Sequence, residues 1–305
     1  MQKLLFMLVM LGLIVTLVCS YSNRTEAAST AMFRPILINV NGKFIQTGTT
    51  PEEVDHRVLI PIRSLSTLGL TYVWDGTTQT VTISNASQSK VKVTLNSKIA
   101  YKDDKPITLD VPAQMKQERV YLPIRFVTEA FDSNVQFETI RKIVFVTSKS
   151  FSGSTDLVSK DLQKARQAAI SLPIQASFKL LHVKETDFMV ESYMFLAGKA
   201  DEYIYEDGYT STIVHIQNGK AIAIGQFTNK GGTGSFDQVA GDLKDTLSPA
   251  FQHFVIENPI VYFNVNYNTT ALDAGYSSDD DKTFRISGEF SGAYENIIIA
   301  LPDGK

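Results

Sequence analysis

Apolar positions along residues 36–147 recur in short runs separated by turn residues, and the same order of runs occurs twice. Runs of β-branched and aliphatic residues bounded by such turns are typical of short strands. Residues 57–63 (Arg-Val-Leu-Ile-Pro-Ile-Arg) recur as residues 119–125 (Arg-Val-Tyr-Leu-Pro-Ile-Arg). In both copies the pattern predicts a strand that ends at proline and a helix that follows, because proline fits the first helical position.

A hairpin precedes each of these segments, and two strands follow it. Asn41-Gly42 predicts a type I′ turn between two short strands, and residues 91–101 repeat this hairpin with a weaker turn. The strands expected after the two helices are residues 72–75, 80–83, 135–138 and 143–146. Since each copy is too small to bury its own apolar face, we expect residues 32–149 to form one α+β domain from two strand–helix–strand copies.

The remaining chain predicts a second α+β module over residues 156–305, after a linker at residues 150–155. We expect one helix from Thr155 or Asp156 to Ser171 and another from Phe236 to Leu247. Asn218-Gly219 lies between two alternating runs and predicts a type I′ hairpin. The other expected strands are residues 177–184, 188–196, 201–205, 260–267, 283–290 and 296–301. Together they predict an antiparallel meander sheet with the helices on one face.

The first residues are typical of a secretory signal peptide. Lys3 precedes an unbroken apolar run from Leu4 to Val18, and the chain becomes polar after it. The run is shorter than the roughly 20 residues that a membrane-spanning helix needs. We therefore expect residues 1–28 to be removed and the mature chain to be secreted, without a transmembrane segment.

Cys19, the single cysteine, lies at the end of the apolar run and is a candidate for lipidation. A bacterial lipobox has a small residue before the cysteine, and Val18 stands there instead. Simple secretion is therefore favoured over a lipid anchor. Cleavage near residue 27 or 28 would leave no thiol for disulfides, catalysis or metal binding.

The net charge of −3 is unevenly distributed. Residues 31–150 carry 15 basic and 11 acidic side chains, whereas residues 151–305 carry 12 basic and 20 acidic ones. This change of sign favours two modules and allows the first to bind an anionic polymer. Nothing in the balance indicates a nucleic-acid partner, and the sequence does not predict the oligomeric state.

Each copy continues with an aromatic–acidic pair, Trp74-Asp75 or Phe137-Glu138. Combined with the arginines and prolines of residues 57–63 and 119–125, these pairs resemble the copper amine oxidase N-terminal-like (stalk) domain. The residues that carry the resemblance are Arg57, Pro61, Arg63, Trp74, Asp75, Arg119, Pro123, Arg125, Phe137 and Glu138. The resemblance implies a secreted protein of a Gram-positive bacterium. The family's usual Asn-Gly before the first arginine is replaced here by Asp55-His56 and Gln117-Glu118.

The same resemblance implies an accessory domain, because copper and the quinone cofactor of the oxidases belong to a separate catalytic domain. The four histidines, His56, His182, His215 and His253, are isolated, and no His-x-His motif occurs. The context Asn266-Tyr267-Asn268 has an amide where the oxidase motif has an acid. The sequence therefore supports neither copper binding nor oxidase activity, and we expect no cofactor.

Arg63 and Arg125 stand in the first turns of the predicted helices, where a cation opposes the helix dipole. One interpretation is that they bind an anionic wall polymer or a phosphate. The favoured interpretation is structural, with Arg63 paired to Asp75 and Arg125 paired to Glu138, because a guanidinium binds a carboxylate well at a fixed helix–sheet contact.

Three segments of the second module have weaker chemical signals. Residues 229–235 are glycine-rich but lack the Gly-Lys-Ser/Thr ending of a phosphate loop, and Ser235 lacks the Gly-x-Ser-x-Gly context of a hydrolase. Residues 279–281 are three aspartates without the spacing of a calcium loop. The acids and tyrosines of residues 202–209 suit either a carbohydrate site or the two faces of a strand. We expect no catalytic residue.

These observations predict a secreted, non-catalytic accessory or binding protein of the cell surface. Its expected partner is an anionic cell-wall polymer or another envelope protein. Two alternatives remain open: a carbohydrate-active hydrolase with a stalk-like targeting module, which needs two facing carboxylates in the second module, and an envelope lipoprotein that binds an apolar ligand in a curved sheet.

Overall fold

The computed structural model describes residues 34–46, 50–182, 190–229, 236–243, 259–277, 283–290 and 294–302. Strands account for 51% of the described chain and helices for 12%. The expected α+β fold class is therefore wrong, and the protein is mostly β-sheet. The predicted signal peptide and Cys19 lie outside the described residues. Within the described ranges, no helix is long and apolar enough to cross a membrane.

Three sheets form the first part of the chain, in the orders β10-β11-β4-β3, β12-β13-β1-β2 and β5-β6-β7-β8-β9. Their strands are β1 (Leu37–Val40), β2 (Lys43–Phe44), β3 (Glu52–Val54), β4 (Arg57–Pro61), β5 (Thr71–Asp75), β6 (Thr80–Ser84), β7 (Lys90–Thr94), β8 (Ile99–Lys102), β9 (Lys105–Thr108), β10 (Gln114–Lys116), β11 (Arg119–Pro123), β12 (Ser133–Glu138) and β13 (Ile143–Ser148).

The two similar seven-residue segments lie beside each other in the first of these sheets. β4 is antiparallel to β11, with Leu122 opposite Ile60 and Pro123 opposite Leu59. Each proline ends its strand, as expected, and a helix follows each strand. Both helices are only seven residues long: η1 (Ile62–Leu68) is a 3₁₀-helix, and α2 (Ile124–Ala130) is α-helical. These short helices explain why the helical share is lower than expected.

The hairpins β3–β4 and β10–β11 turn at residues that are unusual for this conformation. Asp55 and His56 have φ values of 50° and 58°, and Gln117 and Glu118 have values of 46° and 60°. Two successive positive φ values are those of a type I′ turn, which usually contains Asn-Gly. The backbone thus keeps the tight turn although neither residue of either pair is glycine.

The other two sheets have the same order, a closing hairpin beside an opening hairpin. One sheet combines β12–β13 with β1–β2, and the other combines β5–β6 with β7–β8. The direction differs, since β1 is parallel to β13 whereas β7 is antiparallel to β6. The predicted turn at Asn41-Gly42 is present, with φ values of 50° and 78°.

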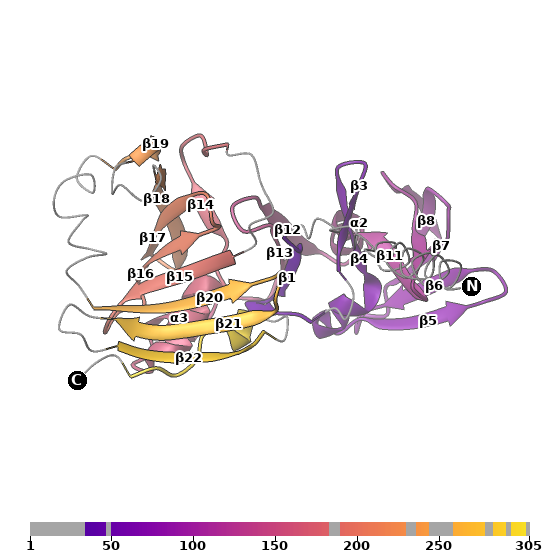
Figure 1. Cartoon of the computed structure of the whole chain (residues 1–305). Helices are drawn as coiled ribbons and strands as arrows, with labels where there is room; N and C mark the ends of the chain where they lie inside the picture. The colour runs from indigo at the N-terminus through magenta and orange to yellow at the C-terminus, as the bar shows by residue number, and fades with distance from the viewer. Residues whose placement is uncertain are drawn as a thin grey trace, which may run out of the picture. The chain divides into compact units, whose positions relative to one another are not determined.

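A single nine-stranded sheet forms most of the second part, in the order β14-β18-β17-β16-β15-β20-β21-β22, with β19 also paired to β18 (Figure 1). Its strands are β14 (Ile174–Ala176), β15 (Val190–Leu196), β16 (Glu202–Glu206), β17 (Ser211–Gln217), β18 (Lys220–Asn229), β19 (Phe236–Gly241), β20 (Ile260–Asn266), β21 (Ala271–Ser277) and β22 (Thr283–Glu289). Apart from β14 beside β18, the neighbours are antiparallel, as the expected meander requires. The turn at Asn218-Gly219 is confirmed by φ values of 51° and 73°.

Several expected elements of this part are wrong. The predicted first helix is divided into η2 (Thr155–Val158) and α3 (Leu162–Ile170), because the Asp161 carboxylate accepts from the backbone of Gln163 and Lys164 and starts a new helix. The segment expected to begin a second helix at Phe236 is strand β19, and residues 244–247 lie outside the described ranges. Instead of a last strand at residues 296–301, the chain forms η3 (Tyr294–Asn296). Strand β21 was not expected.

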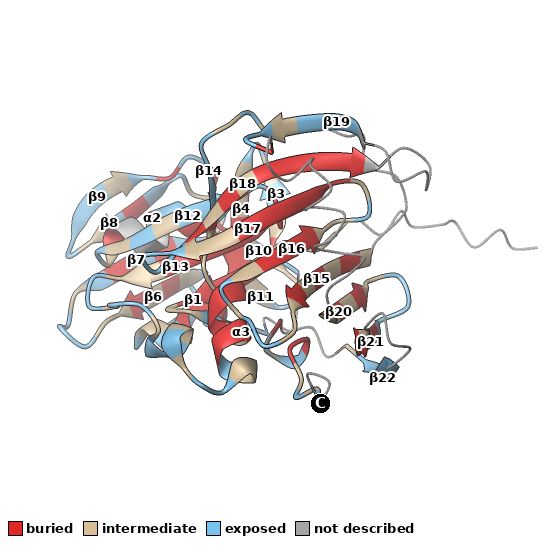
Figure 2. Cartoon of the chain, turned by 90° about the vertical axis from the view of Figure 1, so that its left-hand side faces the viewer, coloured by how far each residue is buried: buried red, intermediate tan, exposed pale blue. Residues whose placement is uncertain are grey.

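Side chains of these sheets pack into two large hydrophobic clusters. One contains apolar side chains of β1, β4, β6, β7, β11 and β13, among them Ile60, Val81 and Leu122. The other combines Phe44 and Phe145 with Tyr193, Phe195 and other side chains of the nine-stranded sheet, and α3 contributes Ala169 and Ile170. Figure 2 shows the buried positions concentrated along β17 and β18. The expected division at residues 150–155 stays a prediction.

Candidate functional site

The sequence motif residues of the first sheet line two grooves. The groove that we call the first groove encloses about 160 Å³. The first copy supplies Pro61, Ile62, Arg63, Tyr72 and Trp74 to its wall. The second copy supplies Met115, Glu118, Arg119 and Val120. Antiparallel pairing of β4 with β11 explains this mixture, since it brings the start of one strand to the end of the other.

The second groove is larger and encloses about 480 Å³. Here the second copy supplies Pro123, Ile124, Arg125, Val135 and Phe137, and the first copy supplies Glu53, His56, Arg57 and Val58. Thr108 and Asp110, which lie between the opening hairpin and β11 of the second copy, also line this groove.

The two grooves correspond residue by residue, at sequence offsets of 62 or 63. Arg63 corresponds to Arg125 and Trp74 to Phe137, and both aromatic side chains are 42% exposed. From the opposite copy, Arg119 corresponds to Arg57. Each groove therefore combines the second arginine of one copy with the first arginine of the other and with an exposed aromatic ring.

Two groups that have no partner among the described residues distinguish the first groove. The Arg63 side chain is exposed, and within the described residues it makes neither a hydrogen bond nor an ion pair. The Tyr72 hydroxyl is buried and lacks a hydrogen-bond partner among the described groups. Burial raises the pKa of Tyr72, so this hydroxyl keeps its proton and can donate it to a ligand.

The second groove contains charges that pair within the protein, and the charge of Arg125, the counterpart of Arg63, also acts on the Asp110 carboxylate. Arg57 Nε donates to Asp110 Oδ2 over 2.7 Å, and this hydrogen bond lowers the pKa of the Asp110 carboxyl. His56 Nδ1 lies 3.5 Å from Glu53 Oε1. Val135 takes the place of Tyr72, so the wall has no hydroxyl at that point. The second groove therefore contains its own carboxylates and lacks the tyrosine hydroxyl of the first groove.

The predicted ion pairs of the two second arginines are wrong. Asp75 accepts from the backbone N–H groups of Thr77 and Thr78 and from the Thr78 hydroxyl, so it closes the turn after β5 rather than binding Arg63. These hydrogen bonds lower the pKa of the Asp75 carboxyl. Glu138 forms its ion pair with Arg141 and not with Arg125.

The pair of Glu138 and Arg141 is buried and connects two parts of the chain. Arg141 is fully buried, and its Nε lies 3.0 and 3.2 Å from the two carboxylate oxygens of Glu138. The guanidinium also donates to the carbonyls of Ile170 and Leu172, over 2.7 and 2.6 Å. Glu138 in turn accepts from the backbone N–H of Ile174. The pair thus satisfies carbonyls at the carboxyl end of α3, which the helix itself leaves open.

A second buried charge was not expected from the sequence. Glu191 on β15 is 1% exposed, and its carboxylate accepts from the hydroxyls of Tyr205, Tyr267 and Tyr294. Arg34 Nη1 lies 3.2 Å from Glu191 Oε1. Burial, together with the charge of Glu191, raises the pKa of the three tyrosines.

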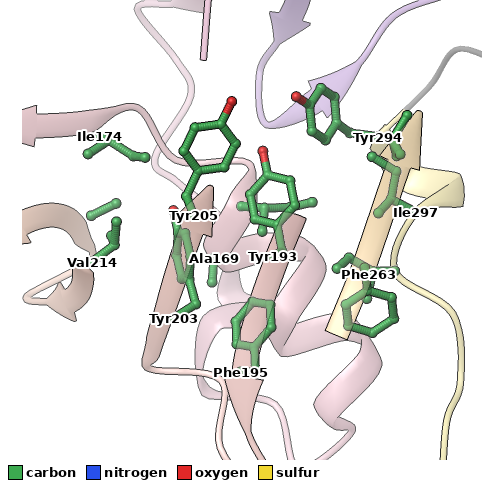
Figure 3. Packing of buried hydrophobic residues seen from close by; sticks show 14 of the residues in the cluster. Ala169, Ile174, Tyr193, Phe195, Tyr203, Tyr205, Val214, Phe263, Tyr294 and Ile297 are labelled. Carbon is green, nitrogen blue, oxygen red and sulfur yellow. The ribbon is translucent and has the colours of Figure 1, made fainter. Parts of the chain in front are cut away.

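Figure 3 shows the hydroxyls of Tyr205 and Tyr294 at the same end of the aromatic cluster. Because the Glu191 carboxylate is enclosed and fully bonded, we interpret it as a structural anchor for the segment before β1. It lines neither of the two grooves.

The remaining sequence candidates do not form a site in the described part of the chain. Within those ranges, no group of three or more histidines, cysteines and acids is placed to hold a metal ion. His215 Nε2 lies 3.2 Å from Glu202 Oε1, its cross-strand neighbour on β16. Residues 230–235 and 279–281, Cys19 and His253 lie outside the described residues.

Comparison with protein families identifies residues 39–146 as a match to the copper amine oxidase N-terminal domain. The match confirms the resemblance inferred from the two copies of the motif, and it includes all the residues that line the two grooves. It does not include the catalytic domain of the oxidases. A search of curated proteins gives no match.

Proposed function

We propose that the protein is a non-catalytic binding protein of the cell envelope, exported by a Gram-positive bacterium. In this proposal residues 39–146 form the module that binds a component of the cell surface. The observation that carries it is the first groove, where Arg63 and the Tyr72 hydroxyl face no partner within the described protein beside the exposed ring of Trp74. An unsatisfied cation, an unsatisfied hydroxyl and an exposed aromatic ring in one groove suit a ligand rather than a core.

Three further observations support the proposal. The matched family domain is an accessory in the oxidases, and the catalytic part is not matched here. The apolar run that follows Lys3 has the composition of a signal peptide. Glu191 of the second module is 1% exposed, and its carboxylate is bonded by tyrosine hydroxyls and lies beside Arg34, so it is not open to a substrate as a hydrolase acid needs to be.

Fractionation of the producing cells tests the proposal. We expect the protein in the wall and medium fractions and a mature amino terminus near residue 28, measured by mass spectrometry. An acylated amino terminus at Cys19 would replace secretion by a lipid anchor. Recovery in the cytoplasm with an intact amino terminus would contradict the proposal.

A further inference from the structure

We infer that only the first groove binds ligand, and that its ligand is a glycan whose pyranose rings carry carboxylate groups. This inference rests on the proposed function and names the ligand of the same module. The second groove keeps the same frame but supplies the carboxylate from its own chain. The second groove is therefore neutralised by its own chain, whereas the first groove leaves Arg63 available to a ligand.

The carboxylate is inferred from the contact in the second groove. There, Asp110 Oδ2 accepts from Arg57 Nε over 2.7 Å, and the charge of Arg125, the counterpart of Arg63, also lowers the pKa of this carboxyl. The residue that corresponds to Asp110 at an offset of 62 is Gly48, and residues 46–50 (Gln-Thr-Gly-Thr-Thr) contain no acid. The first groove thus has two arginines, Arg63 and Arg119, with Glu118 as its wall acid, whereas the second has two arginines with two acids, Glu53 and Asp110. Among the described residues that line the two grooves, positive charge exceeds negative charge only in the first. A carboxylate on a ligand can there pair with Arg63, which has no partner within the described residues.

The pyranose ring is inferred from the other two groups of the first groove. Trp74 is 42% exposed and presents an aromatic face, to which the C–H groups of a sugar ring can pack. The Tyr72 hydroxyl, which has no partner within the described part of the protein, supplies a hydrogen bond for a sugar hydroxyl. The second groove has Phe137 and Val135 at these positions, so it keeps an aromatic ring but lacks the hydrogen bond.

The chain contains a direct reporter for this site, because Trp74 is its single tryptophan. The purified protein is titrated with polygalacturonate, a polymer with a carboxylate on each pyranose ring, and tryptophan fluorescence is recorded at several salt concentrations. We expect a saturable change that weakens as salt rises. Poly(glycerol phosphate) tests a phosphate without a ring, and cellohexaose tests a ring without a charge. Both should bind at least about tenfold more weakly.

Matched variants locate the site. Arg63→Ala should weaken binding of polygalacturonate about tenfold or more, since it removes a charge-assisted contact. Its counterpart Arg125→Ala should leave the affinity unchanged. Asp110→Ala removes the internal carboxylate and should create a second, weaker equivalent of binding, measured by isothermal titration calorimetry. Circular dichroism of each variant establishes that it is folded.

Equal loss in Arg63→Ala and Arg125→Ala would overturn the assignment to the first groove. Equal or stronger binding of the phosphate polymer would overturn the carboxylate, and equal binding of cellohexaose would overturn the charge. No fluorescence change with polygalacturonate would overturn the inference as a whole. The proposed function would survive each of these results if the protein is still found in the wall fraction, so the two failures are distinguishable.

Discussion

At the residue scale, Glu138 and Arg141 form an ion pair in which both charged groups are buried. Both side chains are enclosed, and their remaining hydrogen-bonding groups reach the backbone of Ile170, Leu172 and Ile174. Removing one member leaves the other charged and buried, which costs far more than the pair itself contributes.

We therefore expect Arg141→Met to lower the free energy of unfolding by about 3–5 kcal/mol. Urea denaturation followed by circular dichroism measures the change. The exposed pair of Lys149 and Asp132, 3.1 Å apart, is the matched control. Lys149→Met should change stability by less than about 1 kcal/mol. Similar losses in both variants would contradict the special role of the buried pair.

Glu206, at the end of β16, should make the stability of the protein depend on pH. Burial raises the pKa of its carboxyl above the ordinary value of 4.5, although the Ser211 hydroxyl donates to Oε1 over 2.7 Å. The folded state therefore holds this proton more tightly than the unfolded state. The protonated acid stabilises the fold fully below pH 4.5, and this contribution is lost as the pH rises through the raised pKa. Glu206→Gln should thus stabilise the protein at pH 7 and have little effect at pH 4.

The other end of the same strand gives the control with opposite sign. A hydrogen bond from His215 lowers the pKa of Glu202 below 4.5. Its ionised form contributes stability above pH 4.5 that disappears as the pH falls through the lowered pKa. Glu202→Gln should therefore destabilise the protein at pH 6. Denaturation curves of both variants across this pH range check the signs, and two changes of the same sign would refute this account.

At the element scale, the hairpins of the first sheet are formed against local preference. His56 and Glu118 occupy left-handed positions that glycine adopts at no steric cost, whereas other residues are strained there by roughly 1 kcal/mol. The turns persist because the pairing of β4 with β11 joins the hairpins β3–β4 and β10–β11 into one four-stranded sheet. Strand pairing in the sheet therefore imposes the positive φ values on the turn residues, whatever their own preference.

His56→Gly should accordingly raise the free energy of unfolding by a few tenths to about 1 kcal/mol, since the added freedom of the unfolded chain offsets part of the gain. The converse variant is Gly219→Ala, at a φ of 73° with no atom within 4 Å of the added Cβ. It should lower stability by about 1 kcal/mol through backbone strain alone. Thermal and urea denaturation of the two variants provide the comparison. A loss of stability in His56→Gly would show that the side chain matters more than the backbone.

Local signals explain what was predictable from the sequence. The Asn-Gly turns at residues 41–42 and 218–219 and the strand ends at Pro61 and Pro123 depend on neighbouring residues, and they are correct. The helix expected from Phe236 is wrong because a short segment with mixed spacing fits either period, and pairing with β18 decides for strand. Contacts between residues far apart in the sequence, such as that of Arg34 with Glu191, could not be predicted from local patterns.

The candidate site shows the same division. The arginines and aromatic residues that line the grooves were identified from the repeated motif, but their ion pairs were not. Arg63 was assigned to Asp75 within one copy, whereas the antiparallel sheet places it in a groove with Arg119 of the other copy. The corresponding positions Tyr72 and Val135 already differ in sequence. The consequence of this difference, a hydroxyl in one groove and none at the same point of the other, follows only from the structure.

At the scale of the whole molecule, one buried hydrophobic cluster contains residues from both sides of the sequence boundary near residue 150. Phe145 of β13 belongs to the same buried cluster as Tyr193 and Tyr203, and Arg141 lies 5.7 Å from the Phe145 ring centroid. Arg141 and Arg34 add polar contacts to the later segments. Shared burial of this kind couples the unfolding of the elements that contribute to it.

We therefore expect one cooperative unfolding transition for both parts. Trp74 fluorescence reports on the first part, and far-ultraviolet circular dichroism reports on all sheets, so the two urea curves should coincide in the native sequence. Phe145→Ala should lower stability by about 3–5 kcal/mol and separate the two curves, because it removes a ring from the shared core. Phe137→Ala, at a ring that is 42% exposed, is the matched control and should change stability much less and keep the curves together. Two transitions in the native protein would mean that the sheets fold independently and that the aromatic cluster is a contact between separate domains.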